Sequence, residues 1–290
     1  MNFYLSAVLL GLGYASLAMG IFISMRIFSI PDITTDGSFT LGGAMTAVLM
    51  TAQHPLPLPA IFLIAFVAGA VAGSLTGIIH TKLKVNALLS GIIVMTALFS
   101  VNISLMGRSN IPLLNLPTLF DMVTFTNNTV LQRVIILSII IIVILILLSR
   151  LLRTDFGLAM RATGNNENMV RAQGVSTEAM KIIGLALANG LIAISGFLFT
   201  QQSGFADISM GIGSVILGLG SVMIGEIVLK LLRIKKIAWH ILGAVLGSIL
   251  FQLILAVALS QGIETNYLKL VTAVFVLIVV SIPNLRKNKI

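Results

Sequence analysis

The sequence predicts an all-α polytopic membrane protein, and three observations carry that prediction. Of its 290 residues 58% are hydrophobic and only 9% are charged. The mean hydropathy of +1.10 is typical of chains that bury most of their helices in lipid. Apolar blocks approach the length that crosses a bilayer as a helix, for example VIILSIIIIVILILL at 134–148. A transmembrane barrel would instead show roughly ten-residue segments of alternating polarity.

About nine spans are expected, within a range of about eight to ten. The candidate helices lie at 3–25, 38–53, 57–79, 86–106, 131–149, 180–200, 212–230, 239–259 and 267–283. The first has no basic leader and is taken as an uncleaved span. The second is the least regular, because it is short, rich in glycine and followed by HPLPLP.

Lysine and arginine predict the orientation, because short cytoplasmic loops carry an excess of both. One set of joints, together with the C-terminal tail, holds fifteen of these residues and the opposite set holds three. We therefore expect the N-terminus outside and the C-terminus in the cytoplasm.

Two pairs of segments resemble one another. GSFTLGGAM at 37–45 is similar to GSVILGLGS at 213–221, and AGAVAGSL at 68–75 is similar to LGAVLGSI at 242–249. In the expected topology the members of each pair run in opposite directions. This predicts an inverted repeat of about 31–106 and about 180–260, an arrangement typical of transporters. Chance similarity among helices rich in glycine and alanine is the alternative. The glycine spacing within the second pair predicts close helix packing.

Several functions are disfavoured by what the sequence lacks. There is no GxxxxGK[ST] phosphate loop, no HExxH or GxSxG, and no histidine or carboxylate cluster at metal-ligand spacing. We therefore expect the chain to be neither an enzyme nor a metal-binding protein. The three histidines lie at the ends of predicted spans and are expected at the membrane interface. The net charge is +9, and the basic residues lie at the ends of the predicted spans. This distribution does not indicate nucleic-acid binding. Only Glu226 and Asp36 approach membrane depth, whereas ion-coupled transporters usually bury ionisable groups.

The longest cytoplasmic joint, at about 153–178, predicts two short amphipathic helices. The first contains FGLAMRAT and is expected to stop at Gly164. The second begins at NNEN, where Asn165 or Asn166 would cap it and Glu167 favours a helix start, and it stops at Gly174. A helix lying on anionic lipid and a solvated connector are alternatives. Docking of a cytoplasmic subunit is favoured, because two capped helices specify more than a linker needs.

The stretch IPDITTDGSFTLGGA at 30–44 is polar for its position. Pro31 and Gly37 predict a non-helical segment at 31–37, with Asp36 as N-cap of the following helix. Non-helical backbone at membrane depth persists only inside protein or beside a water-filled cavity. We therefore predict a broken-helix element at a translocation pathway; a short cytoplasmic loop with an ordinary cap is the alternative. The expected pathway residues are Asp32, Thr34, Thr35, Asp36, Ser38 and Thr40.

With these motifs the chain resembles a known family. RATGNNENMVRAQGVS, followed by a span and GIGSVILGLGSVMIGE, resembles the permease subunits of ABC importers of the branched-chain amino acid type over nearly the whole chain. IPDITTDGSFTLGGA is similar to a motif of a branch linked to tryptophan and tyrosine uptake. The resemblance implies that the cytoplasmic joint forms a coupling helix, which inserts into a groove of the ATPase. The implied coupling residues are Arg161, Ala162, Asn165, Asn166, Glu167, Arg171, Ala172 and Gly174.

The resemblance also implies partners. These are ATP-binding-cassette ATPase subunits, an extracytoplasmic solute-binding protein and a second permease chain, with ATP and Mg bound by the ATPase and no cofactor in this chain. The expected function is a single permease domain at 1–290, in the cytoplasmic membrane of a bacterium, that moves a small polar solute such as an amino acid. A self-sufficient ion-coupled transporter, in which Glu226 is essential, is the main alternative; a passive channel or a scaffold is another.

Overall fold

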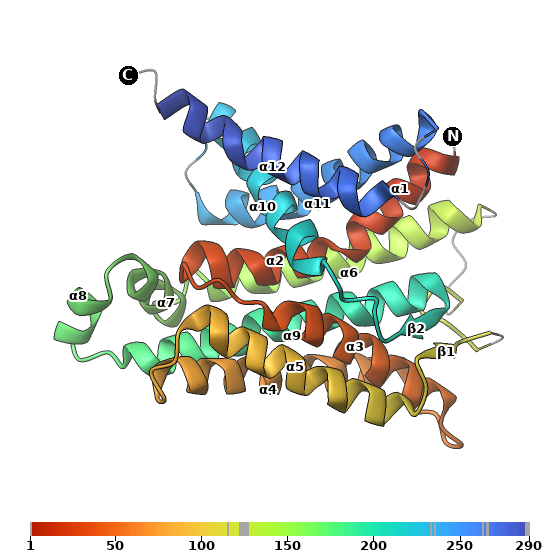
Figure 1. The fold of residues 1–290 in the computed structure, drawn as a ribbon, viewed down its shortest axis with the longest axis horizontal. Helices are drawn as coiled ribbons and strands as arrows, with labels where there is room; N and C mark the ends of the chain where they lie inside the picture. Colours follow the sequence, from red (N-terminus) through yellow and green to blue (C-terminus); the bar gives the residue numbers. More distant parts are fainter. Residues whose placement is uncertain are drawn as a thin grey trace.

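The computed structural model describes residues 2–114, 116–121, 128–232, 234, 236–262, 264 and 267–287, which form an elongated helical bundle (Figure 1). The first half contains α1 Asn2–Gly13, α2 Ala15–Ile21, the π-helix η1 Phe22–Ile27, α3 Thr34–Thr51, α4 Leu58–Thr81, α5 Ala87–Met106, β1 Asn110–Pro112 and α6 Thr129–Leu151. The second half contains α7 Asp155–Asn165, α8 Glu167–Ala172, α9 Thr177–Ser203, β2 Phe205–Asp207, α10 Ser214–Leu231, α11 Ile237–Ser260 and α12 Leu268–Lys287.

Seven helices are long and apolar enough to cross a membrane among the described residues. They are Phe3–Ile27, Leu58–Thr81, Ala87–Met106, Thr129–Leu151, Thr177–Ser203, Ser214–Leu231 and Ile237–Ser260. The first combines α1, α2 and η1 into one span. Helices also occupy the other two expected segments, as α3 and as α12, whose apolar part is Leu268–Val279. The predicted class, an all-α polytopic membrane protein, is confirmed.

The helices form two groups that exchange one member each (Figure 1). In one group α9 packs against α3 and α4, and α5 packs against both of these. In the other group α1 packs against α11, and α10 packs against α11 and α12. α2 contacts α9, α10 and α11 and so joins the groups. A helix from each half of the chain is thus embedded among helices of the other half.

Glycines allow the closest helix contacts. A Cβ atom on Gly73 of α4 would lie 2.1 Å from the carbonyl oxygen of Leu185 in α9. A Cβ atom on Gly247 of α11 would lie 1.9 Å from the carbonyl oxygen of Ser221 in α10. Both glycines therefore let two backbones touch, the role that small residues play where lipid offers no hydrophobic drive for association. The predicted close packing is confirmed.

α3 and α10 both begin well inside the length of the long helices (Figure 1). Before α3 the chain is non-helical only as far as Ile33, so the prediction of a non-helical 31–37 is wrong for its second half. α3 begins earlier because the Asp32 carboxylate accepts a hydrogen bond from Thr34 N, 2.9 Å away. Gly37 lies within the helix, where a Cβ atom would be 2.8 Å from Leu98 of α5. Gly37 therefore allows close packing of α3 against α5 and does not break the helix.

A two-stranded antiparallel sheet closes the end of the molecule opposite α7 and α8 (Figure 1). Asn110 of β1 pairs with Asp207 of β2, and Pro112 pairs with Phe205. β2 follows α9 after a single residue, Gly204, whose φ is +74°. The sheet therefore ties the α5–α6 connection directly to the end of α9.

We predict that Gly73→Ala destabilises the protein by about 1–3 kcal/mol, because the added methyl group forces α4 and α9 apart. The thermal unfolding midpoint in detergent should fall. Val71→Ala, two residues away with a 54% exposed side chain, is the matched control and should leave the midpoint near that of the parent. Equal midpoints for both variants would contradict the close contact.

Candidate translocation pathway and coupling segment

A buried polar cluster joins the start of α3 to the middle of α9. Asn189 of α9 donates from Nδ2 to the Asp32 carboxylate at 2.7 Å, and Ser38 of α3 donates from Oγ to Asn189 Oδ1 at 2.7 Å. All three side chains have no exposed surface. Buried polar groups persist when their hydrogen bonds are satisfied. The amide of Asn189 thus acts as donor to one residue of the α3 region and acceptor to another, which fixes the position of α3 on α9.

The threonines of the predicted pathway are also satisfied within the chain. Thr34 Oγ1 lies 2.7 Å from Thr76 Oγ1 of α4, and Thr35 Oγ1 donates to the carbonyl oxygen of Asp32 at 3.4 Å. Thr40 Oγ1 donates to the carbonyl oxygen of Asp36 at 3.0 Å. Of the six predicted pathway residues, Asp32, Thr34, Thr35, Ser38 and Thr40 are buried and Asp36 is half-buried.

Asp36 connects the starts of the two helices that begin inside the bundle. Its carboxylate accepts hydrogen bonds from Gly213 N at 3.0 Å, Ser214 Oγ at 2.8 Å and Val215 N at 3.0 Å. These groups form the first turn of α10, whose free amides and positive dipole end favour a carboxylate. The expectation that Asp36 caps its own helix is therefore wrong: Asp36 caps α10, 177 residues or more along the chain.

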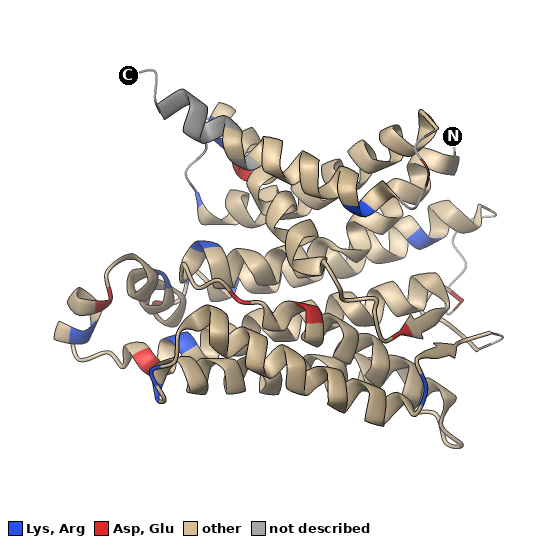
Figure 2. Cartoon of the chain, viewed as in Figure 1, with Lys and Arg blue, Asp and Glu red and all other residues tan. Residues whose placement is uncertain are grey.

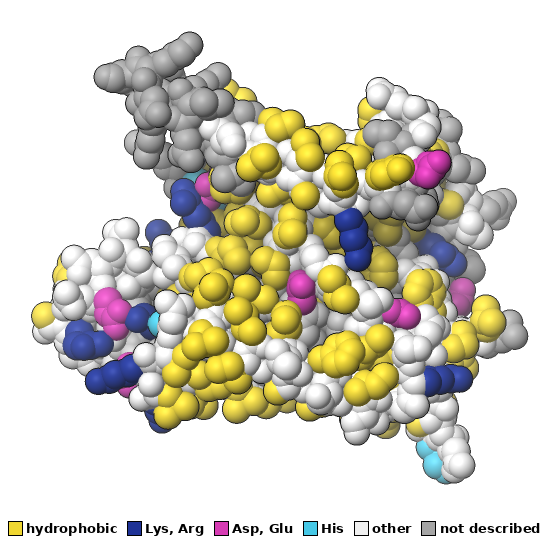
Figure 3. All heavy atoms as spheres, viewed as in Figure 1, with side chains coloured by type: hydrophobic (Ala, Val, Ile, Leu, Met, Phe, Trp, Pro, Cys, Tyr) yellow, Lys and Arg dark blue, Asp and Glu magenta, His cyan; other side chains and the backbone are white. Residues whose placement is uncertain are grey.

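A pocket of about 390 Å³ opens beside Asp36, between α3, α5 and the segment before α10. Among the predicted pathway residues, Asp36 and Thr40 line it. The other lining residues are Gly37, Met95, Thr96, Phe99, Asn102, Ile208 and Ile212. Figure 3 shows that hydrophobic side chains cover much of the face on which α3 and α5 lie, with few acidic side chains between them.

Sequence reasoning missed Asn102 and Asn189, two residues of this region that lie on long spans. Each is a carboxamide within an apolar helix, and intramembrane polar residues are expensive unless they have a partner. That position alone was a signal for a site. Their partners could not be read from the sequence, because Asp32 and Asn189 are 157 residues apart.

The candidate coupling segment consists of α7 and α8 and protrudes from one end of the bundle (Figure 1). Thr154 caps α7 by accepting from Gly157 N at 3.3 Å, and Asn166 caps α8 by accepting from Met169 N at 3.1 Å. Gly174 follows α8 with a φ of +81°, as expected for a helix stop. Both predicted helices and the Asn166 cap are confirmed.

Gly164 does not end the first helix, contrary to expectation, because α7 continues to Asn165. A Cβ atom at Gly164 would lie 1.7 Å from the carbonyl oxygen of Ile27 in η1. The glycine therefore permits α7 to contact the end of the first span. This contact positions α7 against the bundle.

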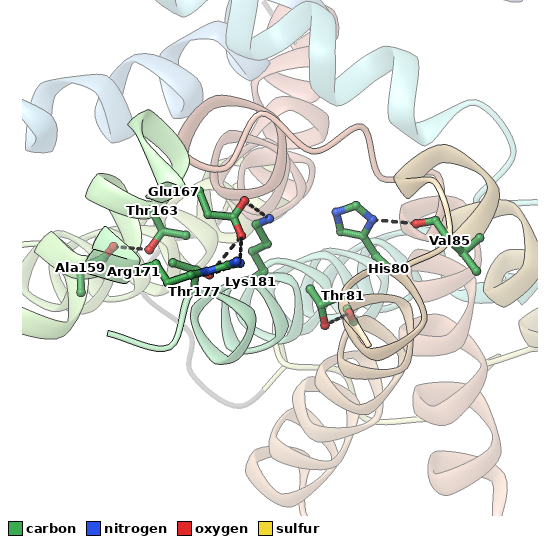
Figure 4. A network of polar contacts seen from close by, with 10 residues as sticks. His80, Thr81, Val85, Ala159, Thr163, Glu167, Arg171, Thr177 and Lys181 are labelled. Atoms are coloured by element: carbon green, nitrogen blue, oxygen red, sulfur yellow. Dashed lines mark hydrogen bonds and ion pairs between the residues drawn. The ribbon is translucent and has the colours of Figure 1, made fainter. Parts of the chain in front are cut away.

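Glu167 fastens α8 to the start of α9 (Figure 4). Its carboxylate contacts Arg171 Nη2 at 3.0 Å and Lys181 Nζ at 2.5 Å, and it accepts from Thr177 Oγ1 at 3.0 Å. The hydrogen bond from Lys181 is the main cause that lowers the pKa of the Glu167 carboxyl below its usual value of 4.5. The carboxylate is ionised at neutral pH and links a short helix to a long one.

The other residues expected to contact an ATPase differ in their exposure. Asn165, Asn166, Arg171, Ala172 and Gly174 are exposed, together with Met169, whose side chain is 52% exposed. Arg161 and Ala162 are half-buried and line a cleft of about 740 Å³ between α7, η1 and α11, which Arg26 and His240 also line. The exposed part of α7–α8 is thus a compact surface that combines the apolar side chain of Met169 with polar groups and the exposed Arg171.

Glu226, the residue that an ion-coupled mechanism would need, is 6% exposed and forms an ion pair with Arg26 of η1. Among the residues that the structure describes, no group of three or more histidine, cysteine, aspartate or glutamate side chains could hold a metal ion. Figure 2 shows few charged residues along the middle of the long helices.

Comparison with known proteins places these features in context. Residues 3–281 match the family described as branched-chain amino acid transport system / permease component. A tyrosine transport system permease protein of Clostridioides difficile is 34% identical over 93% of this chain and 87% of the relative. An uncharacterised protein of Rickettsia prowazekii is 33% identical over 97% of this chain and 98% of the relative.

More distant relatives also match. The autoinducer 2 import system permease protein LsrC of Escherichia coli is 24% identical over 72% of this chain and 61% of the relative. No solved structure matches the chain.

Replacing Asp36 with alanine should loosen the start of α10 by about 1–2 kcal/mol, the cost of a lost cap. Amide hydrogen exchange at 213–215 should become faster by roughly 5- to 30-fold. Asp36→Asn, which keeps an acceptor oxygen, should show a smaller increase. Asp155→Ala, an exposed acidic residue in the first turn of α7, should leave this exchange unchanged; an equal effect would refute the cap.

Glu167→Gln should detach α8 from α9, because the uncharged amide cannot hold Lys181 and Arg171 as strongly. We expect roughly fivefold faster hydrogen exchange across 167–172, corresponding to about 1 kcal/mol. The swap Glu167→Lys with Lys181→Glu should restore part of the protection. Glu178→Gln, which changes an exposed residue at the start of α9, is the control. If hydrogen exchange across 167–172 is as slow in Glu167→Gln as in this control, the ion pairs do not hold α8.

Proposed function

The chain belongs to the family of branched-chain amino acid transport system permease components, and on that premise we propose that it is the membrane-spanning subunit of an ATP-binding-cassette importer. The observation that carries the proposal is the capped pair α7–α8, fastened to α9 and exposed at its tip. Because the chain contains no phosphate-binding loop, the work of ATP hydrolysis falls to partner subunits. The chain itself is a transport component and performs no covalent chemistry.

We propose that the tip of α8 docks into a groove of the ATPase. Met169, which is 52% exposed, supplies an apolar anchor on a surface that also exposes Asn165, Asn166 and Ala172. A small apolar centre with a polar rim is the usual anatomy of a protein interface. A lipid-bound helix would need more cations and larger apolar residues than this tip offers.

An inverted repeat is supported by the way the helices exchange between the groups. Ser16 of α2 donates to the carbonyl oxygen of Leu191 in α9 at 2.7 Å, and Ser195 of α9 donates to that of Gly13 at 2.6 Å. These reciprocal bonds join the span Phe3–Ile27 of the first half to the span Thr177–Ser203 of the second half. The repeated segments GSFTLGGAM and GSVILGLGS belong to α3 and α10, the two helices that begin inside the bundle. Broken helices whose starts meet are where such transporters bind substrate.

The proposed topology has about nine spans, with α3 and α12 added to the seven apolar ones. Lysines and arginines are more frequent at the end of the molecule that carries α7 and α8 (Figure 2), which supports a cytoplasmic location for that end. Of the fifteen basic residues counted for this side, Arg233, Lys235 and Lys289 lie outside the described residues. The membrane would be the cytoplasmic membrane of a bacterium, the source of each relative named above.

The proposed cargo is an amino acid, since one relative is named for tyrosine transport. Residues 1–290 would form one permease domain, paired with a second copy. A solute-binding protein would deliver cargo to the end that carries β1 and β2. The pocket at Asp36 and Thr40 would lie on the pathway, with the buried cluster at Asp32, Thr34, Thr35 and Ser38 supporting the broken helix beside it.

The decisive experiment is to purify the tagged chain from its native membrane in mild detergent and identify what accompanies it. A stoichiometric ATPase should co-purify, and Met169→Glu should abolish the association by placing a charge at the interface centre. Glu178→Lys, which changes the charge at an exposed position of α9, is the control and should retain the ATPase.

A different result would favour the ion-coupled transporter. In that case the chain purifies alone, moves solute in vesicles under an ion gradient and loses that activity in Glu226→Gln. Uptake that requires ATP and the ATPase partner, and that an ion gradient alone does not drive, would exclude the ion-coupled transporter.

A further inference from the structure

We propose that the cleft of about 740 Å³ between α7, η1 and α11 binds the phosphate group of an anionic phospholipid. This site lies outside the candidate pathway, and the inference does not depend on an ATPase partner. The volume of the cleft is within the roughly 300–1,000 Å³ typical of sites for small molecules.

The cleft lies where two apolar spans have their ends. Ile27 ends the span Phe3–Ile27, Ile237 begins the span Ile237–Ser260, and both residues line the cleft. Trp239, in the first turn of α11, is 45% exposed, and exposed tryptophan is enriched at the level of the lipid headgroups. The cleft is therefore at the depth where the phosphate groups of a bilayer lie.

The ionisable side chains of the cleft are basic. Arg26, Arg161 and His240 line it, and none of its described lining residues is aspartate or glutamate. Arg26 is already paired with Glu226. Arg161 forms neither an ion pair nor a hydrogen bond in the described part of the chain. A guanidinium can give two parallel N–H donors to one phosphate, so Arg161 is available for an anionic ligand.

The start of α11 adds backbone donors to the same cleft. Lys236 is the N-cap residue of α11, and no described side chain caps this helix start. Ile237 and His240 are about one turn apart and both line the cleft, so this face of the first turn borders it. Free amides and the positive end of a helix dipole favour a phosphate. The amides of α11 and the guanidinium of Arg161 therefore approach the ligand from different walls.

Apolar side chains complete the lining and favour a lipid over a free anion. They are Phe22, Ile27, Leu158, Ala162 and Ile237. Inorganic phosphate would leave these side chains in water, whereas the glycerol backbone and first methylene groups of a phospholipid would cover them. Basic pockets between the cytoplasmic ends of spanning helices are suited to anionic lipid headgroups.

The test measures equilibrium binding of radiolabelled dioctanoyl phosphatidylglycerol to the purified full chain in a neutral detergent. Unlabelled dioctanoyl phosphatidylglycerol should displace the label. Dioctanoyl phosphatidylcholine carries a compensating cation, and inorganic phosphate lacks the apolar body. Both should compete at least about tenfold more weakly, an effect that one hydrogen bond to a charged group or one buried apolar group supplies.

One set of variants removes charge. Arg161→Gln should weaken binding by roughly fivefold, the effect of one basic residue beside an anionic lipid. Arg161→Lys keeps the charge and should bind more tightly than Arg161→Gln. Arg153→Gln removes an exposed arginine outside the cleft; this variant is the matched control and should bind as the parent does.

A second pair of variants adds charge at exposed positions, where the fold tolerates it. Leu158→Glu places a carboxylate in the cleft at a 49% exposed position and should weaken binding by at least about tenfold. Met169→Glu places the same charge on α8 at a 52% exposed position outside the cleft and should retain parental binding. Gel filtration verifies that each variant is folded, and this pair decides the site if Arg161→Gln does not fold.

Equal competition by phosphatidylcholine, or equal losses in Arg153→Gln and Arg161→Gln, would reveal only a general attraction of basic residues to anionic lipid and would overturn the inference. Equal competition by inorganic phosphate would assign the cleft to a free anion and would also overturn it. Failure here is separable from failure of the proposed function, because Met169→Glu should lose the ATPase and yet retain the lipid.

Discussion

The structure depends on satisfying backbone amides where helices start inside the bundle. A helix start leaves up to four amides without partners, and in lipid no water is present to serve them. At α10 the carboxylate of Asp36 fills that need, and ahead of α3 the carboxylate of Asp32 does so. Asp36 thus joins α3 to the start of α10, and Asp32 joins the start of α3 to α9. This explains why so polar a stretch occurs directly after the first apolar span.

From the same constraint follows the arrangement around it. Asp32 is itself held by Asn189, which also holds Ser38. α9 must therefore run close to α3, and the small residues of α3, α4 and α9 make that approach possible. A polar cluster in lipid is stable only when it is complete. Packing and polar satisfaction are here one requirement, met by residues far apart in the sequence.

Much of this could be predicted from the sequence, and the failures have a common cause. Apolar length alone located a helix at all nine segments, and local rules placed the Asn166 cap and the Gly174 stop. Two errors fell on Gly37 and Gly164, each of which was taken as a helix breaker, and a third assigned the cap by Asp36 to α3 instead of α10. Both glycines lie inside helices, where the missing side chain makes room for Leu98 in one case and for the backbone of Ile27 in the other. Composition cannot separate a glycine needed for its backbone freedom from one needed for its small size. The partners of Asp36 and Asn102 were likewise invisible, because they depend on how distant helices come to lie side by side.

The attachment of α8 has a mechanical consequence. Glu167 contacts Thr177 and Lys181 in the first turns of α9. α9 is an unbroken helix of 27 residues, which corresponds to a length of about 40 Å at 1.5 Å per residue. At its far end only Gly204 separates this rod from β2, which is paired with β1. Halfway along, Asn189 holds the broken start of α3. If α8 docks a partner as proposed, a displacement of α8 would be carried along α9 to Asn189 and to the β1–β2 sheet as one rigid movement.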